Sequence, residues 1–568
     1  MSLNKSFQLL KRILKNGRSY IPSFLLLGAV GLVLLPLELY GLMLTRKLID
    51  KGLLLHDWDV IQPILVVLAG LFVIRSFASY GTAVFSTKLQ LRVNQKFQNR
   101  LFSHLMHLPM RYLAQQSTGQ LMARVLDDGT RFAAVFDLLF GRAVLEPLKL
   151  LVLMALLAYF NVRLSAIMFS ATVASFVIIY FMGNKLHLVS KKIQRKNACL
   201  YGFVEQMLSK VELVKSKVTE KQTARDFRDQ LDNLIRLLLN SLKISLVARP
   251  LLQILKYLAL GTVFIYGGWL ISSNSLTLGT LTIFLGATYL FFNTLDSVGQ
   301  TYGLLRENLA RMEVIYSIFD SPTERYEITS QVKMPPSISR IEFDHVTFGY
   351  NTSTPVLKDV SFSIAAGGVF GITGQSGSGK TTLIRLLVRF YEQDKGTIRL
   401  NGQSIQQFDL TALRAAIGIV FQENLILNDT LRKNIVYGSR RLSDVQIIRS
   451  AKLSGAHDFI KLLPQRYETM VGEGGRLLSG GERQRLAIAR AIVTAPEILI
   501  LDEGTSFLEV EQESTILQSI KEHRMNKITI VVSHRLSAMK IADRILTIDN
   551  GRVVETDFQA LASAMRGH

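Results

Sequence analysis

A glycine-rich run follows a short apolar stretch in the second half of the chain. Val369–Thr373 predicts a buried strand, and the residues after it fit the pattern GxxxxGK[ST] of a phosphate loop. Glycines let backbone N–H groups curl round phosphate oxygens, a lysine reaches the outer phosphates, and the following helix points its positive end at the anion. We therefore predict phosphate binding by Gly374, Gln375, Ser376, Gly377, Ser378, Gly379, Lys380, Thr381 and Thr382.

Two acids end a second apolar run. Ile498–Leu501 predicts another buried strand, and Asp502 and Glu503 follow it directly. Solvated charges at a strand end are the ordinary explanation in an α/β domain. Beside a phosphate loop, however, Asp502 can hold Mg²⁺ together with the Thr381 hydroxyl, and Glu503 can polarise the water that attacks the γ-phosphate. We predict ATP hydrolysis with Mg²⁺ as the metal ion.

Four further short motifs accompany the phosphate loop. They are LSGGERQ at Leu478–Gln484, VFQE at Val420–Glu423, VSHR at Val532–Arg535, and Tyr350, 24 residues before Gly374. They resemble, respectively, the signature motif, the Q-loop, the switch histidine and the adenine-stacking aromatic of ATP-binding cassette (ABC) proteins. One letter differs, because Glu482 stands where the family's LSGGQ signature ends in Gln.

The resemblance implies a role for each motif. Tyr350 would stack on adenine, and Ser479, Gly480, Gly481 and Glu482 would complete the ATP site of the opposite subunit. The implied catalytic residues are Glu503, His534 and Gln422. The implied metal ligands are Thr381, Gln422 and Asp502, the last also counted with the ATP-binding residues.

Two neighbouring segments refine the resemblance. Met470–Gly475 resembles the x-loop of ABC exporters, in which Glu473 would couple the cassette to the membrane domain. After Glu503 the family pattern ATSALD becomes GTSFLE, with Phe507 for the usual Ala and Glu509 for the D-loop aspartate. This departure affects the dimer interface, while the residues expected to hydrolyse ATP are all present.

The first half of the chain is built of long apolar runs. A helix needs about 20 mainly apolar residues to cross a bilayer. Six stretches qualify, at about residues 21–45, 60–86, 132–160, 163–185, 250–271 and 279–303. The two long connections after the second and fourth spans are mainly polar and helical, and we expect them to extend into the cytosol and return near Pro109–Gln120 and Val204–Val214.

Charge fixes the predicted orientation. The net charge of +22 is concentrated before the first span and in the two long connections, whereas the loops 161–163 and 272–275 carry little. Lys and Arg mark cytoplasmic loops, so both termini are predicted to be cytosolic. This distribution disfavours nucleic-acid binding, and the single cysteine, Cys199, excludes an intrachain disulfide.

Several charges lie inside the predicted spans. Counted at 1.5 Å per residue from the outer loops, Arg75, Glu146, Lys256 and Asp296 all fall about 22–27 Å below the outer end, with Arg142 about a turn deeper, Lys149 about a turn shallower and Glu38 near mid-membrane. We predict a substrate cavity lined by Arg75, Arg142, Glu146, Lys256 and Asp296, since charges within spans tend to be functional. The structural alternative is pairing along one helix, Arg142 with Glu146 and Glu146 with Lys149, together with snorkelling.

The charged residues also bear on the substrate. The chain resembles lipid A flippases and multidrug exporters, and Arg75 stands where the flippases carry a headgroup-binding arginine. Asp296 stands where they carry a lysine, and Leu145 where they carry a second arginine. Mixed charge therefore fits a zwitterionic or cationic amphiphile at least as well as a bis-phosphorylated lipid.

Together these features predict a multi-domain membrane protein. We expect an all-α transmembrane domain of six spans and the type IV (type I) exporter fold at 1–322, a linker at 323–338, and an α/β P-loop ABC nucleotide-binding domain at 339–568. The predicted function is ATP-driven export or flipping of a lipid or other amphiphile by a homodimer, multi-pass in a bacterial inner membrane. A heterodimer, an exporter of peptides or other small molecules, and an ATP-regulated channel or sensor stay open as alternatives.

Overall fold

The computed structural model describes residues 3–324, 332–351, 354–439, 442–505 and 507–566. The chain forms two compact units, Met1–Leu108 with Gln116–Pro322, and Pro109–Gln115 with Thr323–His568. Residues 325–331, within the predicted linker, and Ser506, within the predicted D-loop, lie outside the described part.

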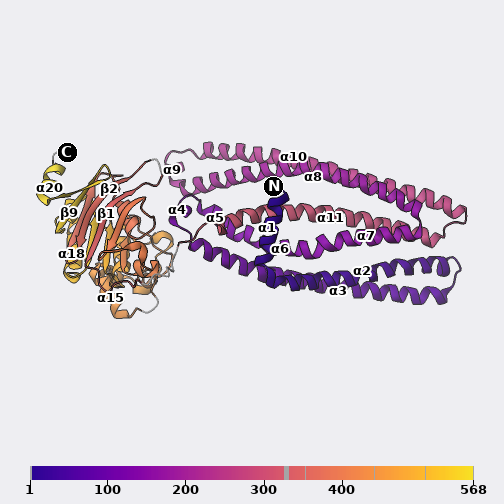
Figure 1. Ribbon diagram of the computed structural model, residues 1–568, viewed down its shortest axis with the longest axis horizontal. Helices are drawn as coiled ribbons and strands as arrows, with labels where there is room; N and C mark the ends of the chain where they lie inside the picture. The colour runs from indigo at the N-terminus through magenta and orange to yellow at the C-terminus, as the bar shows by residue number, and fades with distance from the viewer. Residues whose placement is uncertain (1–2, 325–331, 352–353, 440–441, 506, 567–568) are drawn as a thin grey trace. The chain divides into compact units, whose positions relative to one another are not determined.

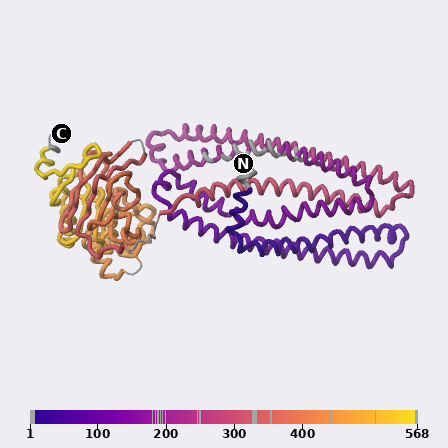
Figure 2. Tube along the Cα trace, viewed as in Figure 1, coloured from indigo at the N-terminus to yellow at the C-terminus, as the bar shows by residue number. Residues whose placement is uncertain are grey.

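The first unit consists of long helices that run side by side (Figures 1 and 2). The longest, α10, has 53 residues, which at 1.5 Å per residue is about 80 Å, more than twice the thickness of a bilayer core. The helices of this unit are α1 (Leu3–Asn16), α2 (Ile21–Lys47), α3 (Trp58–Met106), α5 (Thr118–Leu126), α6 (Phe132–Asp137), α7 (Ala143–Phe160), α8 (Val162–Ser209), α9 (Val211–Ser216), α10 (Glu220–Ser272) and α11 (Leu278–Phe319). Short 3₁₀ turns (Arg18–Tyr20, Asp128–Arg131) and π turns (Leu48–Leu53, Leu138–Arg142) connect some of them.

Six helical stretches of the described residues are long and apolar enough to cross a membrane. They are Arg18–Leu53, Trp58–Met106, Thr118–Phe160, Val162–Met182, Pro250–Ser272 and Leu278–Phe319. In each of the first three, only 11% of the most apolar window is buried within the chain. Apolar surface left open on this scale needs a lipid or protein environment, which fits membrane spans rather than a soluble bundle.

Short connections turn the chain between spans, and side-chain caps fix them. The Asn161 side chain accepts a hydrogen bond from the Leu164 N–H at the start of α8 (3.1 Å), and Thr277 caps α11 in the same way. Asp50, in the π turn after α2, also accepts from the Gly279 N–H (2.7 Å) and from the Thr277 hydroxyl (2.8 Å). Asp50 therefore joins the turn after α2 to the beginning of α11.

Two sheets make up most of the second unit. A six-stranded sheet has the order β10–β9–β3–β8–β7–β6, parallel except for the β9–β10 pair, and a four-stranded antiparallel sheet has the order β2–β1–β4–β5. All five residues of β7 and of β8 are buried, as expected for parallel strands covered on both faces. The strands are β1 (Arg340–Phe348), β2 (Leu357–Ala365), β3 (Val369–Gly374), β4 (Lys395–Leu400), β5 (Gln403–Ser404), β6 (Ile417–Val420), β7 (Ile498–Asp502), β8 (Ile528–Val532), β9 (Arg544–Asp549) and β10 (Arg552–Thr556).

The second unit also contains helices, of which α12, α13 and α17 pack on the central sheet. The one after β3 is α12 (Lys380–Leu387), and α17 (Gly480–Ile492) begins at the signature motif. The others are α4 (Met110–Leu113), α13 (Leu410–Ala415), α14 (Leu431–Ile435), α15 (Asp444–Leu453), α16 (Ala456–Leu462), α18 (Val510–His523), α19 (Leu536–Met539) and α20 (Phe558–Arg566), with 3₁₀ turns at Ile405–Gln407, Arg466–Glu468 and Glu473–Gly475. A helical bundle followed by an α/β nucleotide-binding fold confirms the predicted fold class.

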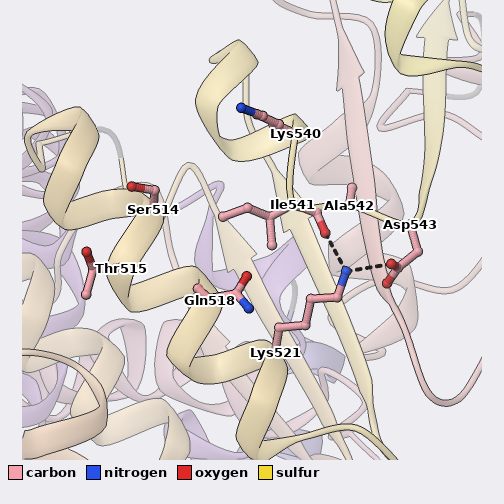
Figure 3. Close-up of a pocket in the computed structure, with 8 residues that line it drawn as sticks. All are labelled: Ser514, Thr515, Gln518, Lys521, Lys540, Ile541, Ala542 and Asp543. Atoms are coloured by element: carbon pink, nitrogen blue, oxygen red, sulfur yellow. Dashed lines mark hydrogen bonds and ion pairs between the residues drawn. The ribbon is translucent and has the colours of Figure 1, made fainter.

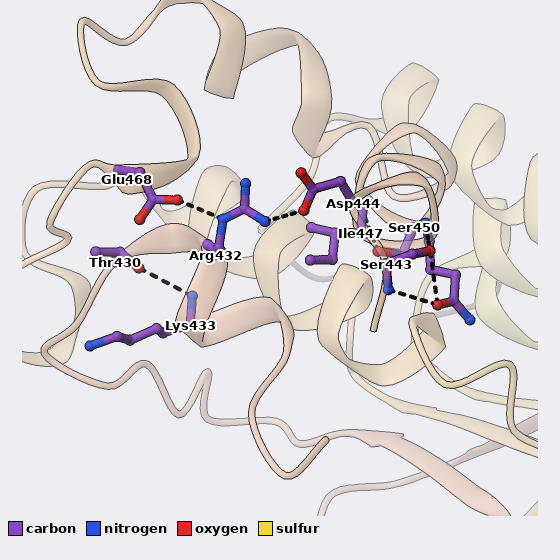
Figure 4. Close-up of polar contacts among 9 residues, drawn as sticks. Thr430, Arg432, Lys433, Ser443, Asp444, Ile447, Ser450 and Glu468 are labelled. Carbon is purple, nitrogen blue, oxygen red and sulfur yellow. Dashed lines mark hydrogen bonds and ion pairs between the residues drawn. The ribbon is translucent and has the colours of Figure 1, made fainter. Parts of the chain in front are cut away.

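A polar cluster fixes the small helices around α17. Arg432 on α14 lies between Asp444, the first residue of α15, and Glu468 (Figure 4). Its guanidinium donates to Asp444 at 2.5 Å and to Glu468 at 2.6 Å. Because α14 and α15 both pack on α17, this bridge helps to hold the helix that carries the signature motif.

Candidate nucleotide-binding and catalytic site

The predicted phosphate loop connects β3 to α12 and is shaped by three glycines with positive φ. Gly374, Gly377 and Gly379 have φ of 144°, 80° and 113°, a region that L side chains rarely adopt. At Gly374, an added Cβ would also lie 2.2 Å from the Ile548 carbonyl oxygen, so only glycine fits there. The turn thus presents backbone N–H groups at the beginning of a helix, the geometry that binds phosphate.

Two side chains in this loop are suited to an anion. Lys380 is 7% exposed, and its Nζ donates to the carbonyl oxygens of Gly374 (2.8 Å) and Gln375 (2.9 Å). Burial lowers the pKa of Lys380, and an anion beside it would favour the charged form of the side chain. The Ser378 hydroxyl is buried and has no hydrogen-bond partner among the described residues, as expected where a phosphate oxygen is to bind.

The acid pair ends β7 as predicted. Asp502 is 2% exposed, and burial raises its pKa, a shift that a hydrogen bond from Thr381 partly offsets. Glu503 has φ of 51°, which is strained for a residue with a side chain, and its N–H donates to the Val532 carbonyl oxygen (2.9 Å). This strained residue directly follows β7, which ends at Asp502 at the carboxyl end of the sheet.

Three predicted catalytic residues meet at that carboxylate. Gln422, after β6, donates from Nε2 to Glu503 Oε2 at 2.8 Å. His534, after β8, places Nε2 3.3 Å from Glu503 Oε1. Because β6, β7 and β8 are parallel neighbours, their carboxyl ends bring these three side chains together.

The signature segment begins α17 with a capping box. The Ser479 hydroxyl accepts from the Glu482 N–H (3.3 Å), and the Glu482 carboxylate accepts from the Ser479 N–H (2.8 Å). Glu482, which differs from the family's Gln, therefore completes the cap. Since Ser479 Oγ only accepts in this arrangement, its hydroxyl hydrogen is still available to donate to a phosphate.

Tyr350 lies just beyond β1, which ends at Phe348. The chain turns tightly at Gly349, where a Cβ would lie 2.7 Å from two carbonyl oxygens. The Tyr350 ring meets Phe348 and Tyr391 edge to face, at centroid distances of 5.2 and 5.1 Å. Its hydroxyl lies 3.2 Å from Thr382 Oγ1 on the phosphate-loop helix, so the aromatic ring stands beside the loop.

Comparison with known proteins decides the family. Residues 357–506 match the model of the ABC transporter family, and residues 25–295 match that of the ABC transporter transmembrane region. The ATP-dependent lipid A-core flippase of Thiobacillus denitrificans is 33% identical over 527 residues, which cover 92% of this chain and 90% of the relative. This chain is an ABC transporter.

A second relative and a solved structure support the same family. The ATP-dependent lipid A-core flippase of Syntrophus aciditrophicus is 29% identical over 564 residues, covering 99% of this chain and 94% of the relative. A solved structure of a bacterial Atm1-family ABC exporter with ATP bound superposes with a TM-score of 0.84 at 25% identity, covering 98% of this chain and 97% of that one. The resemblance drawn from the motifs is therefore confirmed: the transporter is an integral membrane protein that binds and hydrolyses ATP for export.

The donor set of this ABC transporter suits Mg²⁺ bound together with ATP. Thr381 and Asp502 are hydrogen-bonded to each other, and Gln422 approaches from the next strand end. Among the described residues, no group of three or more His, Cys, Asp and Glu side chains converges on a metal site. Mg²⁺ typically keeps few protein ligands and takes the others from phosphates and water, so this sparse set fits an ion that arrives with the nucleotide.

Charged residues within the spans form ion pairs between different helices, rather than along one helix as the structural alternative predicted. Glu38 on α2 accepts from Arg75 on α3 (3.1 Å) and from Lys149 on α7 (2.9 Å). Glu38 contacts Arg75 although counting residues placed it nearer to mid-membrane. Among the described residues, Arg142 and Glu146 make no ion pair with each other.

The other two predicted cavity residues involve α10 and α11. Lys256 on α10 donates to Asn293 Oδ1 (2.9 Å), and its Nζ lies 3.8 Å from the centre of the Tyr289 ring. Asp296 lies one turn further along α11, on the same helix as both of these contacts. Of the five predicted cavity residues, Arg75 pairs with Glu38, whereas Lys256 and Asp296 lie on α10 and α11. Glu146 lies on α7, and Arg142 lies in the π turn just before it.

Three residues with specific polar contacts were not among the predicted sites. Glu38 was noted only for its depth, and its partners are 37 and 111 residues away in sequence. Gln484 and Glu513 are 1% and 0% exposed, yet both are polar. The only signal of these contacts in the sequence was a polar Gln or Glu at a helix position otherwise occupied by apolar residues. This signal does not identify the groups that the side chain contacts.

A separate hollow of 580 Å³ lies on the surface beside α18 (Figure 3). It is lined by Ser514, Thr515, Gln518, Lys521, Lys540, Ile541, Ala542 and Asp543, none of which is a predicted site residue. One of its two lysines, Lys521, already donates to Asp543 (2.5 Å) and to the Ile541 carbonyl oxygen (3.0 Å). This hollow is therefore not part of the nucleotide site.

Proposed function

We propose that two copies of this chain form a homodimeric exporter that uses ATP and Mg²⁺ to move an amphiphile, a lipid or a drug-like molecule, across a bacterial inner membrane. One observation carries the proposal: the phosphate loop, the convergence of Gln422 and His534 on Glu503, and the Ser479 cap all occur in one chain together with six spans. A heterodimer in which one subunit is degenerate would not need all of these in the same subunit.

Hydrolysis in this proposal follows from the residues at the strand ends. Lys380 and the loop N–H groups hold the phosphates of one subunit's ATP, while the second copy's Ser479 segment approaches from the other side. Mg²⁺, when bound, supplies positive charge that neutralises the phosphate oxygens. Glu503 orients and polarises the attacking water, and His534 stabilises the γ-phosphate side of the site.

Release of the Glu503 carboxylate from Gln422 and His534 would explain why the two cassettes must close before ATP is hydrolysed. The Glu503 carboxylate lies 2.8 Å from Gln422 Nε2 and 3.3 Å from His534 Nε2. A γ-phosphate would compete for both partners, freeing an oxygen of Glu503 to accept a proton from water. Hydrolysis would therefore begin only after the two cassettes close on ATP, which links turnover to the movement of the membrane helices.

The amphiphile is inferred from the charged side chains within the spans. Glu38 with Arg75 and Lys149 sums to a charge of +1, and Lys256 is close to Tyr289 and Asn293. Charges at this depth favour a molecule that carries its own polar headgroup into the membrane. Relatives named lipid A-core flippases support a lipid among the candidates, while the mixed charge fits a zwitterionic or cationic headgroup at least as well as a bis-phosphorylated one.

Reconstituted vesicles test the proposal. Purified protein is placed in liposomes that contain fluorescent zwitterionic, anionic or cationic amphiphiles, and ATP-dependent movement between leaflets is followed by quenching. We expect movement of at least one class, lost in Glu503→Gln, which retains ATP binding. ATP hydrolysis with no movement of any amphiphile would favour a channel, a sensor or an exporter of peptides, and a requirement for a second, different chain would favour the heterodimer.

A further inference from the structure

The backbone that follows the catalytic strand is held on two sides by buried polar side chains. This catalytic loop, defined here as Glu503–Thr505 with Phe507 and Leu508, begins with the strained φ of 51° at Glu503. Strained backbone persists only where the surroundings hold it. The groups that do so come from α17 on one side, and from α18 and the segment after His534 on the other.

On the first side, Gln484 spans the loop. It lies on α17, one turn and a half after Ser479, and is 1% exposed. Its Nε2 donates to the Glu503 carbonyl oxygen (3.1 Å), and its Oε1 accepts from the Phe507 N–H (2.8 Å). Only an amide offers both a donor and an acceptor in this shape, since a carboxylate lacks the donor and an apolar side chain lacks both.

On the second side, Glu513 is completely buried on α18. Its two carboxylate oxygens accept from the Thr505 hydroxyl and from the Ser537 hydroxyl, each at 2.5 Å. Arg535, which directly follows His534, lies 3.8 Å from the same carboxylate and donates to the Leu508 carbonyl oxygen at 2.7 Å. Glu513 therefore joins the catalytic loop to the segment that carries the switch histidine.

We propose that Gln484 and Glu513 are positioning residues for ATP hydrolysis, which set the backbone of Glu503 and couple it to the signature helix and the switch histidine. The inference rests on the proposed homodimer, because Ser479 would there contact the γ-phosphate held by a second copy. A displacement of α17 on phosphate binding passes through Gln484 to the Glu503 carbonyl. ATP bound in one composite site thereby adjusts the catalytic carboxylate of the other.

The experiment compares side-chain variants of the full-length protein in lipid nanodiscs. Gln484→Met removes both hydrogen bonds at similar volume, and Gln484→Glu keeps only the acceptor for Phe507. Glu513→Gln keeps shape and removes the charge that faces Arg535. Gln518→Met is the matched control, because Gln518 is exposed on α18 and bonds Glu522 at the surface (2.8 Å).

A positioning role predicts a separation of kcat from KM. For Gln484→Met we expect kcat for ATP to fall about 10- to 100-fold, since two hydrogen bonds to buried backbone groups are lost. KM and the affinity for a fluorescent ATP analogue should stay within about threefold, because neither residue contacts the nucleotide. The Hill coefficient for ATP should fall from about 2 in the wild type toward about 1 in Gln484→Met. Gln518→Met should match the wild type.

Each outcome decides the inference. Folded variants of both residues with wild-type kcat and Hill coefficient would overturn it, and so would loss of ATP affinity in parallel with kcat. If Gln484→Met does not fold, Gln484→Glu and Glu513→Gln decide by the same criteria, and failure of all three to fold would assign these residues to folding alone. A wild-type Hill coefficient of about 1 would overturn the coupling between the two sites. ATP hydrolysis by a single copy in the nanodisc would instead contradict the homodimer and leave the kcat comparison intact.

Discussion

The charged cluster within the spans offers the sharpest quantitative test. The Glu38 side chain is 11% exposed and bonds Arg75 and Lys149, so one carboxylate joins α2, α3 and α7. Glu38→Gln keeps the shape of the side chain and removes only the charge. Two cations would then lie near each other without their counter-ion, and we expect the helical unit to lose stability.

The magnitude follows from the distances. At an effective dielectric constant of about 20, two unit charges about 3 Å apart attract by roughly 5–6 kcal/mol before desolvation is subtracted. Breaking a buried pair costs about 3–5 kcal/mol, and the lower end applies because the Arg75 side chain is 48% exposed. A loss of about 3 kcal/mol lowers the melting temperature by about 4–5 °C for a unit of some 300 residues.

Thermal unfolding in nanodiscs measures this loss for Glu38→Gln, Arg75→Gln and the double variant. We expect the double variant to be about 1–2 kcal/mol more stable than the sum of the single changes predicts, because the two residues share one contact. Glu220→Gln serves as control, since its carboxylate meets Lys215 (3.1 Å) in an exposed position. Additive effects, or a Glu38→Gln shift no larger than that of the control, would refute the ion cluster.

Three other changes test separate parts of the structure. Asp50→Ala removes the acceptor of the Gly279 N–H and should cost about 1 kcal/mol, seen as faster hydrogen exchange at that amide. Asp502→Asn should abolish ATP hydrolysis yet raise the melting temperature of the nucleotide-free protein at neutral pH. Burial raises the pKa of Asp502, so its ionisation destabilises the fold increasingly as pH rises from about 3.9 through the raised value, and the variant should lack this pH dependence. Tyr350→Phe should keep the KM for ATP, whereas Tyr350→Ala should raise it about tenfold, because the ring face rather than the hydroxyl is expected to stack on adenine.

The local parts of this transporter could be read from the sequence. The phosphate loop needs glycines at fixed places because their φ angles are positive, and this requirement is visible in any single chain. The spans are visible because a bilayer demands about 20 apolar residues in succession. The acid pair, Gln422 and His534 each follow an apolar run, and parallel strand ends in one sheet necessarily gather them.

Contacts between distant segments needed the tertiary structure. Residue counting gave Glu38 a depth, but not its pairing with Arg75 and Lys149, because pairing depends on how α2, α3 and α7 are rotated against one another. Likewise, the sequence marked LSGGERQ as a phosphate-binding motif and did not assign Gln484 to the Glu503 carbonyl.

The sequence by itself therefore determined the family, the spans and the residues expected to meet ATP. These depend on local backbone conformation, on apolar length and on motif order. Only the tertiary structure decided which buried polar groups satisfy one another, since a buried donor or acceptor takes whichever partner the packing of the whole unit brings within about 3 Å. For this reason Glu38, Gln484 and Glu513 became specific hypotheses only after the fold was known.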